Sequence, residues 1–147
     1  MLPQRMSLVT LGVADVAASR RFYEGLGFKT SGNDQDGVAF FDMNGVLLAL
    51  FGRKDLAEDA AVAVEGGDAR SRISLAINLD SETAVNTAMA FASEKGGRVT
   101  QPARKVFWGG YAGYFADPDG FLWEIAYNPF WPLDEHGRPQ LAPPGAT

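Results

Sequence analysis

The sequence contains no cysteine and only one histidine, His136, which lies in a proline-rich C-terminal segment. Protein sites for zinc, nickel, iron and copper depend largely on Cys and His side chains. Ordinary nitrogen and sulfur metal coordination is therefore nearly excluded, and we expect no cofactor. The lack of cysteine also excludes a disulfide framework.

Long apolar runs and a surplus of basic residues are missing as well. No run approaches the roughly 18 apolar residues that span a bilayer, and the first residues lack a secretory apolar segment, so we expect a cytoplasmic protein without membrane contact. A formal net charge of −5 and a pI near 4.8 disfavour nucleic-acid binding, which needs concentrated Lys and Arg. With 147 residues, 46% of them hydrophobic, the chain fits one globular domain.

An internal repeat is the most informative feature that is present. The segment from Val9 to Val13 (VTLGV) recurs from Ile73 to Ile77 (ISLAI), and each copy leads into an amphipathic helical stretch. Two similar halves suggest a shared cleft between them.

The first half predicts a strand, a helix and a hairpin. Residues 8–13 form the strand, and Asp15 is placed to cap a helix that ends near Gly25 and Gly27. Strands over 38–43 and 46–51 flank Asn44-Gly45, a two-residue turn signal. We expect residues 54–71 to connect the halves, with Gly66-Gly67 breaking any short helix.

The second half repeats this order. A strand over 73–78 precedes a helix over 82–95 capped by Ser81. Strands over 111–116 and 121–127 follow, joined by the turn 117–120 (DPDG). Five of the eight prolines occur after Asn128, so we expect an extended tail over residues 129–147.

Pairing through the two turns predicts which side chains share a face. The first turn pairs Phe40 with Ala49, and a four-residue second turn pairs Ala116 with Phe121, hence Tyr111 with Ala126. One face then packs on the helices and includes Tyr114, Phe121, Trp123 and Ile125. The other face mixes small, polar and aromatic groups, which suits a ligand pocket, although an open sheet also shows such a mixture on its solvent side. Its members are Leu8, Thr10, Gly12, Phe40, Ala49, Arg72, Ser74, Ala76, Tyr111, Gly113, Phe115, Glu124 and Ala126.

The motifs of both halves together resemble the vicinal oxygen chelate superfamily, which contains glyoxalases, bleomycin-resistance proteins and dioxygenases. The similarity covers residues 6–128 and rests on LGVADV at 11–16, SRRFY at 19–23, LGF at 26–28, WGGY at 108–111, DPDG at 117–120 and WE at 123–124. It implies an α+β fold within one domain, 1–147, in which two βαβββ modules, 6–53 and 72–128, form an incomplete mixed-sheet barrel around a cleft. It also implies a homodimer.

Metal-dependent relatives hold a divalent ion at positions that fall here on Leu8, Ala49, Arg72 and Glu124. Only Glu124 is a carboxylate, so the resemblance implies a degenerate metal site. We hypothesise that the Arg72 guanidinium replaces the missing cation and pairs with Glu124; the alternative is that Arg72 points to solvent.

We predict a metal-independent protein that binds a small molecule in the cleft. The predicted ligand-binding residues are Thr10, Phe40, Arg72, Ser74, Trp108, Tyr111, Phe115 and Glu124. Phe107, Phe130 and Trp131 would stack on a planar ligand or fill a subunit interface, and Asn78 would supply a hydrogen bond or cap its strand. The alternatives are a lyase, isomerase or dioxygenase that uses Glu124 or Tyr111 as acid or base, and a homodimeric structural or interaction domain.

Overall fold

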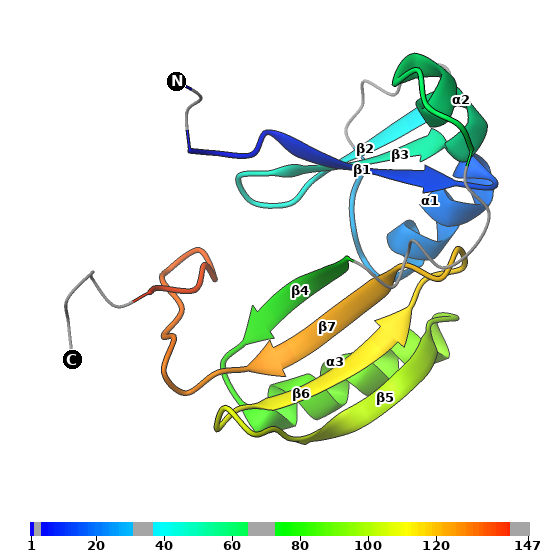
Figure 1. The fold of residues 1–147 in the computed structure, drawn as a ribbon. Coiled ribbons are helices and arrows are strands. Elements are labelled where there is room, and N and C mark those ends of the chain that lie inside the picture. Colours follow the sequence, from blue (N-terminus) through cyan, green and yellow to red (C-terminus); the bar gives the residue numbers. More distant parts are fainter. Residues whose placement is uncertain (2–3, 31–36, 65–72, 142–147) are drawn as a thin grey trace. The chain divides into compact units, whose positions relative to one another are not determined.

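The computed structural model describes residue 1 and residues 4–30, 37–64 and 73–141. The chain divides into two compact units, Met1–Gly67 and Asp68–Thr147 (Figure 1). Each unit is built around its own mixed β-sheet, and each is described by itself below.

The first unit has a three-stranded sheet in the order β1-β3-β2, in which β1 runs parallel to β3 and β2 antiparallel to it. The Asn44-Gly45 turn joins β2 to β3 with φ of 67° and 111°, as the sequence predicts, and Phe40 pairs with Ala49. The elements are β1 (Leu8–Val13), α1 (Val16–Gly25), β2 (Val38–Asp42), β3 (Leu47–Gly52) and α2 (Arg53–Asp59).

Aromatic side chains fill the space between α1 and this sheet. Tyr23 and Phe41 are fully buried, and the Tyr23 ring stacks on Phe28 with centroids 5.8 Å apart. The Asp15 side chain caps α1 by accepting a hydrogen bond from the Ala18 amide at 3.0 Å, so the predicted cap is confirmed.

The helix α2 differs from expectation because it occupies the start of the predicted connection. It packs on β1 at Gly12, where an added Cβ would lie 3.2 Å from the Arg53 Cα and from Leu56 Cδ2. Gly12 therefore makes room for a helix rather than for a ligand.

The second unit has a four-stranded sheet in the order β4-β7-β6-β5. Its first strand runs parallel to its last, as in the first unit, which confirms that the repeated segments are equivalent strands. The elements are β4 (Ser74–Leu79), α3 (Glu82–Glu94), β5 (Arg98–Lys105), β6 (Tyr111–Ala116) and β7 (Leu122–Tyr127). Strand β5 was not predicted from its sequence, which is polar and contains Pro102.

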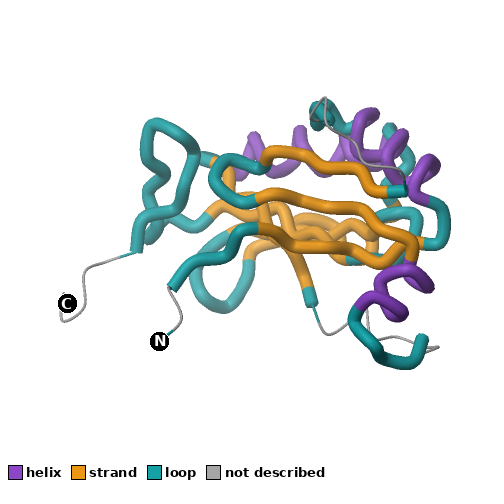
Figure 2. Tube along the Cα trace, turned by 90° about the horizontal axis from the view of Figure 1, so that it is seen from above, coloured by secondary structure: helices purple, strands orange, loops and turns teal. Residues whose placement is uncertain are grey.

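Helix α3 runs along one face of this sheet, as Figures 1 and 2 both show. Ser81 caps it by accepting a hydrogen bond from the Ala84 amide at 3.0 Å. Trp123 and Ile125 of β7 are buried on the helix side, as predicted. The face opposite α3, here called the helix-free face, carries Ser74, Ala76, Asn78, Ala112, Tyr114, Glu124 and Ala126.

The predicted register between β6 and β7 is wrong by one residue. Asp117 pairs with Phe121, its amide donating to the Phe121 carbonyl at 2.9 Å, so the loop spans only residues 118–120 and Ala116 pairs with Leu122. The buried Asp117 carboxylate closes this loop by accepting from the amides of Asp119 and Phe121 at 2.9 and 2.8 Å. A shift of one residue exchanges the two faces of a strand.

This shift reverses the predicted faces of four residues on β6. Tyr114 lies on the helix-free face, whereas Tyr111, Gly113 and Phe115 lie on the helix side, contrary to prediction. A Cβ added to Gly113 would lie 3.0 Å from Met89 of α3, and the buried Phe115 ring stacks on Trp123 at 6.5 Å.

Residues 129–141 of the tail contain a short hairpin-like turn rather than only the extended segment that we expected, and residues 142–147 lie outside the described residues. Leu133 pairs with Pro139, and the Asp134 carboxylate accepts from the amides of His136 and Arg138 at 2.8 and 2.9 Å. These bonds lower the pKa of Asp134.

The two units together confirm the predicted α+β class, and no helix in the described part of the chain is long and apolar enough to cross a membrane.

Candidate functional site

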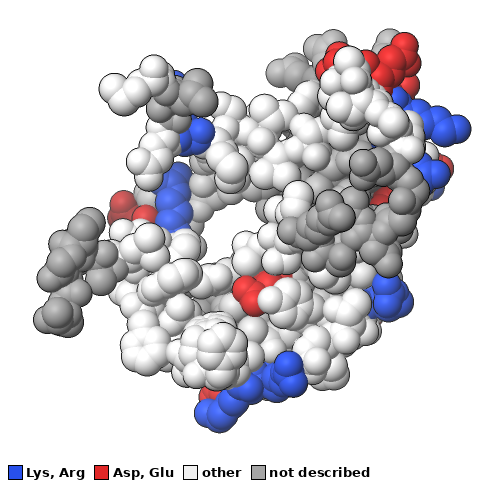
Figure 3. All heavy atoms as spheres, in the orientation of Figure 1, with Lys and Arg blue, Asp and Glu red and all other residues white. Residues whose placement is uncertain are grey.

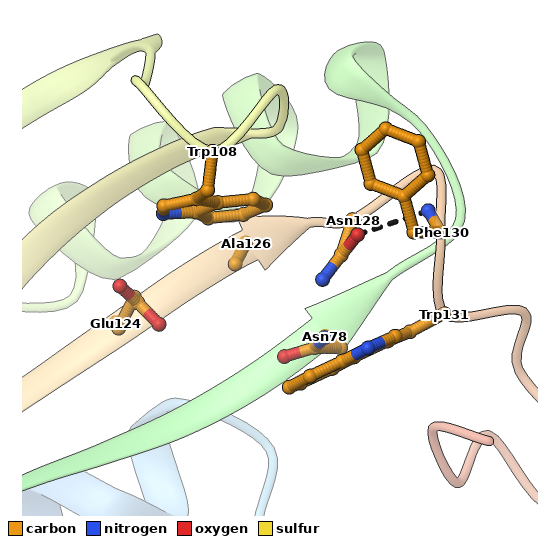
Figure 4. A pocket seen from close by; sticks show the side chains of 7 residues that line it. All are labelled: Asn78, Trp108, Glu124, Ala126, Asn128, Phe130 and Trp131. Carbon is orange, nitrogen blue, oxygen red and sulfur yellow. Dashed lines mark hydrogen bonds between the residues drawn. The ribbon is translucent and has the colours of Figure 1, made fainter. Parts of the chain in front are cut away.

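A pocket of about 440 Å³ lies on the helix-free face of the second unit (Figure 4). Its side chains come from β4, β7, the loop before β6 and the segment after β7. They are Asn78, Trp108, Glu124, Ala126, Asn128, Phe130 and Trp131.

Strand β7 supplies the floor of the pocket. Glu124, Ala126 and Asn128 alternate along the chain, so their side chains point to the same side. Ala126 lies between the two polar groups and has no atom beyond Cβ. The floor is therefore low and apolar in the middle and polar at both ends.

Two glycines shape the loop that carries Trp108. A Cβ on Gly110 would collide with the Trp108 ring, so the indole lies directly over this residue. Gly109 has a φ of 93°, which favours glycine, and a Cβ added there would lie 3.0 Å from the Phe130 ring. The loop thus holds Trp108 over the pocket and contacts the segment after β7.

Asn128 fixes the turn that brings Phe130 and Trp131 to the pocket. Its side-chain oxygen accepts a hydrogen bond from the Phe130 amide at 2.9 Å, and its carbonyl accepts from the Trp131 amide at 3.2 Å. Since the Asn128 oxygen is engaged, its amino group is the part that remains to donate to a ligand.

Tyr114 forms the most direct polar contact to the pocket carboxylate. Its hydroxyl donates to Glu124 Oε2 at 2.6 Å, from the position opposite Glu124 on β6. This hydrogen bond, with burial and the charge of Glu124, raises the pKa of Tyr114 to about 12. Tyr114 is therefore a neutral donor near pH 7.

The structure brings only some of the predicted site residues together. Glu124 and Trp108 line the pocket, as do Asn78, Phe130 and Trp131, while Ser74 lies on the same sheet face outside the pocket lining. Tyr111 does not reach the pocket: its hydroxyl donates to Asn86 of α3 at 2.7 Å. Phe115 is buried under α3, so the predicted cleft position of both residues is wrong.

Four of the predicted residues belong to the first unit. Thr10 and Phe40 both pair with Ala49, and Leu8 lies two residues before Thr10, so the four share one sheet face as predicted. Their ligand and metal roles stay predictions. Arg72 lies outside the described residues, and so does its hypothesised pair with Glu124.

The sequence analysis did not identify Tyr114 and Asn128 as site residues. Tyr114 was placed on the other face by the register error. Asn128 continues the alternation from Glu124 through Ala126, and that spacing could have identified it.

The described side chains at the positions that the resemblance assigns to the metal do not fit a divalent ion. Leu8 and Ala49 offer no donor atom, and the carboxylate of Glu124 is engaged by Tyr114. Within residues 4–30, 37–64 and 73–141, no three His, Asp or Glu side chains are grouped closely enough to hold a metal.

Comparison with known proteins gives the family. The model of the Glyoxalase/Bleomycin resistance protein/Dioxygenase superfamily matches residues 5–125. The chain belongs to this superfamily, and its two mixed sheets are those of the glyoxalase fold. No match was found among curated proteins.

Solved structures agree with this assignment. A glyoxalase-related enzyme from Fulvimarina pelagi is 39% identical, with a TM-score of 0.84 over 96% of this chain and 100% of that chain. A glyoxalase/bleomycin resistance protein/dioxygenase from Nocardioides is 27% identical, with a TM-score of 0.74 over 86% and 85%. A lactoylglutathione lyase from Agrobacterium tumefaciens, 20% identical with a TM-score of 0.68 over 90% and 100%, shares the fold.

Proposed function

We propose that this protein binds a small organic molecule in the pocket of the second unit without a metal ion. The pocket itself carries the proposal, because it joins three aromatic rings to one carboxylate and two amides. Small-molecule sites typically combine apolar walls with a few polar groups that orient the ligand. Binding of this kind needs no catalytic group. The proposed function is therefore to bind and sequester a compound without converting it.

The surface charge is compatible with a small ligand rather than a polyanion. On the face that Figure 3 shows, the described Lys and Arg side chains occur in small separate groups. Phosphate-backbone binding needs a continuous basic surface.

An enzyme is the second candidate, and the observation in its favour is Glu124 in the pocket. The 39% identical structure from Fulvimarina pelagi is described as a glyoxalase-related enzyme. The Tyr114 hydroxyl is poorly suited to proton donation near pH 7, since a pKa of about 12 lies far above the working range of a general acid. The Tyr111 hydroxyl donates its hydrogen bond to Asn86 of α3 and does not reach the pocket. Glu124 is thus the residue that catalysis would depend on, as a proton acceptor.

A thermal-shift screen with Glu124→Gln tests the proposal. A panel of aromatic and cationic compounds, including proflavine and benzamidine, is expected to contain compounds that raise the midpoint of unfolding of the wild type but not of Glu124→Gln. Glu58→Gln, an exposed carboxamide change in α2, is the matched control and should respond like the wild type. The proposal is wrong if every stabilising compound acts equally on wild type and Glu124→Gln. It is also wrong if elemental analysis finds stoichiometric metal that Glu124→Gln releases.

The homodimer and the cytoplasmic location stay predictions drawn from the resemblance and from the sequence. Light scattering of the full chain is expected to give twice the mass of one chain. A mass of 15.8 kDa at micromolar concentration would contradict the dimer.

A further inference from the structure

The family match ends at residue 125, yet four of the seven residues that line the pocket follow it: Ala126, Asn128, Phe130 and Trp131. The aromatic side chains of the tail therefore belong to the part of the pocket that lies outside the residues matched by the family model. A segment of this kind is placed to determine ligand specificity.

The two indoles form opposite walls. Figure 4 shows Trp108 and Trp131 on opposite sides of the pocket, with Ala126 between them and both rings turned toward the shared space. Trp131 is 42% exposed and Phe130 is 69% exposed. Exposed aromatic faces over a low floor are what a flat ring needs for stacking.

The ends of the pocket differ in hydrogen-bonding character. Glu124 accepts at one end, because a carboxylate has no proton to give when ionised, and the Asn128 amino group donates at the other. An extended chain places residues four apart at about 13 Å between Cα atoms. This length suits a ligand of two or three fused rings.

We propose that Trp131, positioned by the Asn128 turn, is the specificity-determining residue of the pocket and forms an aromatic clamp with Trp108. The clamp takes a flat fused-ring compound that carries N–H donors or a positive charge at the Glu124 end. This inference rests on the proposed function of the same pocket, and it adds the ligand class and the role of the tail. A cationic ring also gains from contact with an indole face.

Proflavine is a suitable probe of the stacking and of the Glu124 end, because it is flat and cationic and its amino groups donate; it makes no use of the Asn128 donor. Its fluorescence anisotropy reports binding without depending on protein tryptophan. The full-length wild type is expected to bind it saturably at one per chain. Trp131→Ala is expected to weaken binding by about tenfold or more, which is the scale of loss when a stacking partner is truncated.

Three comparisons make the test specific. Phe107→Ala removes a fully exposed ring beside Trp108 that does not line the pocket, and it should leave proflavine affinity within about twofold. Trp131→Phe should retain more affinity than Trp131→Ala. Sodium 2-naphthoate, a flat anion, should bind at least about tenfold more weakly than proflavine, since it faces Glu124.

The clamp is wrong if Trp131→Ala binds proflavine as tightly as the wild type, or if the wild type does not bind proflavine saturably. It is also wrong if naphthoate binds as well as proflavine. The proposed function survives these results when compounds of other shape still stabilise the wild type through Glu124. Circular dichroism of Trp131→Ala is expected to match that of the wild type, because the Trp131 side chain is partly exposed.

Discussion

Tyr114 and Glu124 face one another across β6 and β7, with the phenol donating to the carboxylate at 2.6 Å. The pair holds Glu124, the one acidic side chain among the described residues that line the pocket, in a fixed orientation. It also makes Tyr114 the tyrosine whose titration reports on the site.

We predict that Tyr114 titrates near pH 12 and returns toward 10 in Glu124→Gln, because a neutral amide oxygen replaces the charged acceptor that favours the protonated phenol. The measurement is the ultraviolet absorbance of phenolate as a function of pH. Subtracting the curve of Tyr114→Phe from that of the wild type isolates the titration of Tyr114. A folded-state pKa above the unfolded value means that the native state holds its proton longer. The resulting stability is present below pH 10 and is lost as the pH rises through 12. If the phenol of Tyr114 titrates near pH 10 in the native wild type, the hydrogen bond does not exist in solution.

Asp117 should be required for the β6–β7 loop. Replacing it by Ala leaves two amides without their acceptor, which is expected to lower the free energy of unfolding by about 1–3 kcal/mol. Asp117→Asn keeps an acceptor oxygen and should cost less. Urea denaturation followed by circular dichroism measures both variants, and equal losses would contradict the role given to the Asp117 oxygen.

Phe41 should carry much of the stability of the first unit. It is fully buried beside Tyr23 and Phe28, so Phe41→Ala is expected to cost about 3–5 kcal/mol. Phe91→Ala, on a residue that is 41% exposed on α3, is the control and should cost far less. The same denaturation experiment compares them. Similar losses in the two variants would mean that Phe41 is not packed as described.

Arg72 and Glu124 should be coupled if the guanidinium stands where relatives hold a metal. A double-mutant cycle with Arg72→Gln and Glu124→Gln is expected to give a coupling energy of about 1 kcal/mol in urea denaturation. A coupling below about 0.3 kcal/mol would remove this hypothesis. Arg72→Gln should also strengthen proflavine binding if it frees the carboxylate.

Local chemistry allowed much of the fold to be predicted from the sequence. Asp15 and Ser81 cap their helices through their own side chains, and Asn44-Gly45 adopts positive φ regardless of distant contacts. The register after Asp117 could not be read in this way, because the Asp117 carboxylate shortens the loop by one residue and this exchanges the faces of β6. Strand β5 was missed because its polar sequence has no apolar alternation.

The candidate site was predicted less completely than the fold. Glu124 and Trp108 were identified through the family motifs, and Trp131 was weighed between ligand stacking and a subunit interface. Tyr114 was lost through the register error. The clamp depends on a turn held by Asn128, which is a local signal that the sequence analysis did not use. It also depends on the contact between Phe130 and Gly109, which lie far apart in the sequence, and no local pattern encodes that contact.

Calorimetric titration of proflavine into protein treated with EDTA tests metal-independent binding in the pocket most directly. We predict saturable binding at one per chain, with an affinity that added Zn²⁺ or Ni²⁺ leaves unchanged. Binding that appears only after Zn²⁺ or Ni²⁺ is restored would contradict the account.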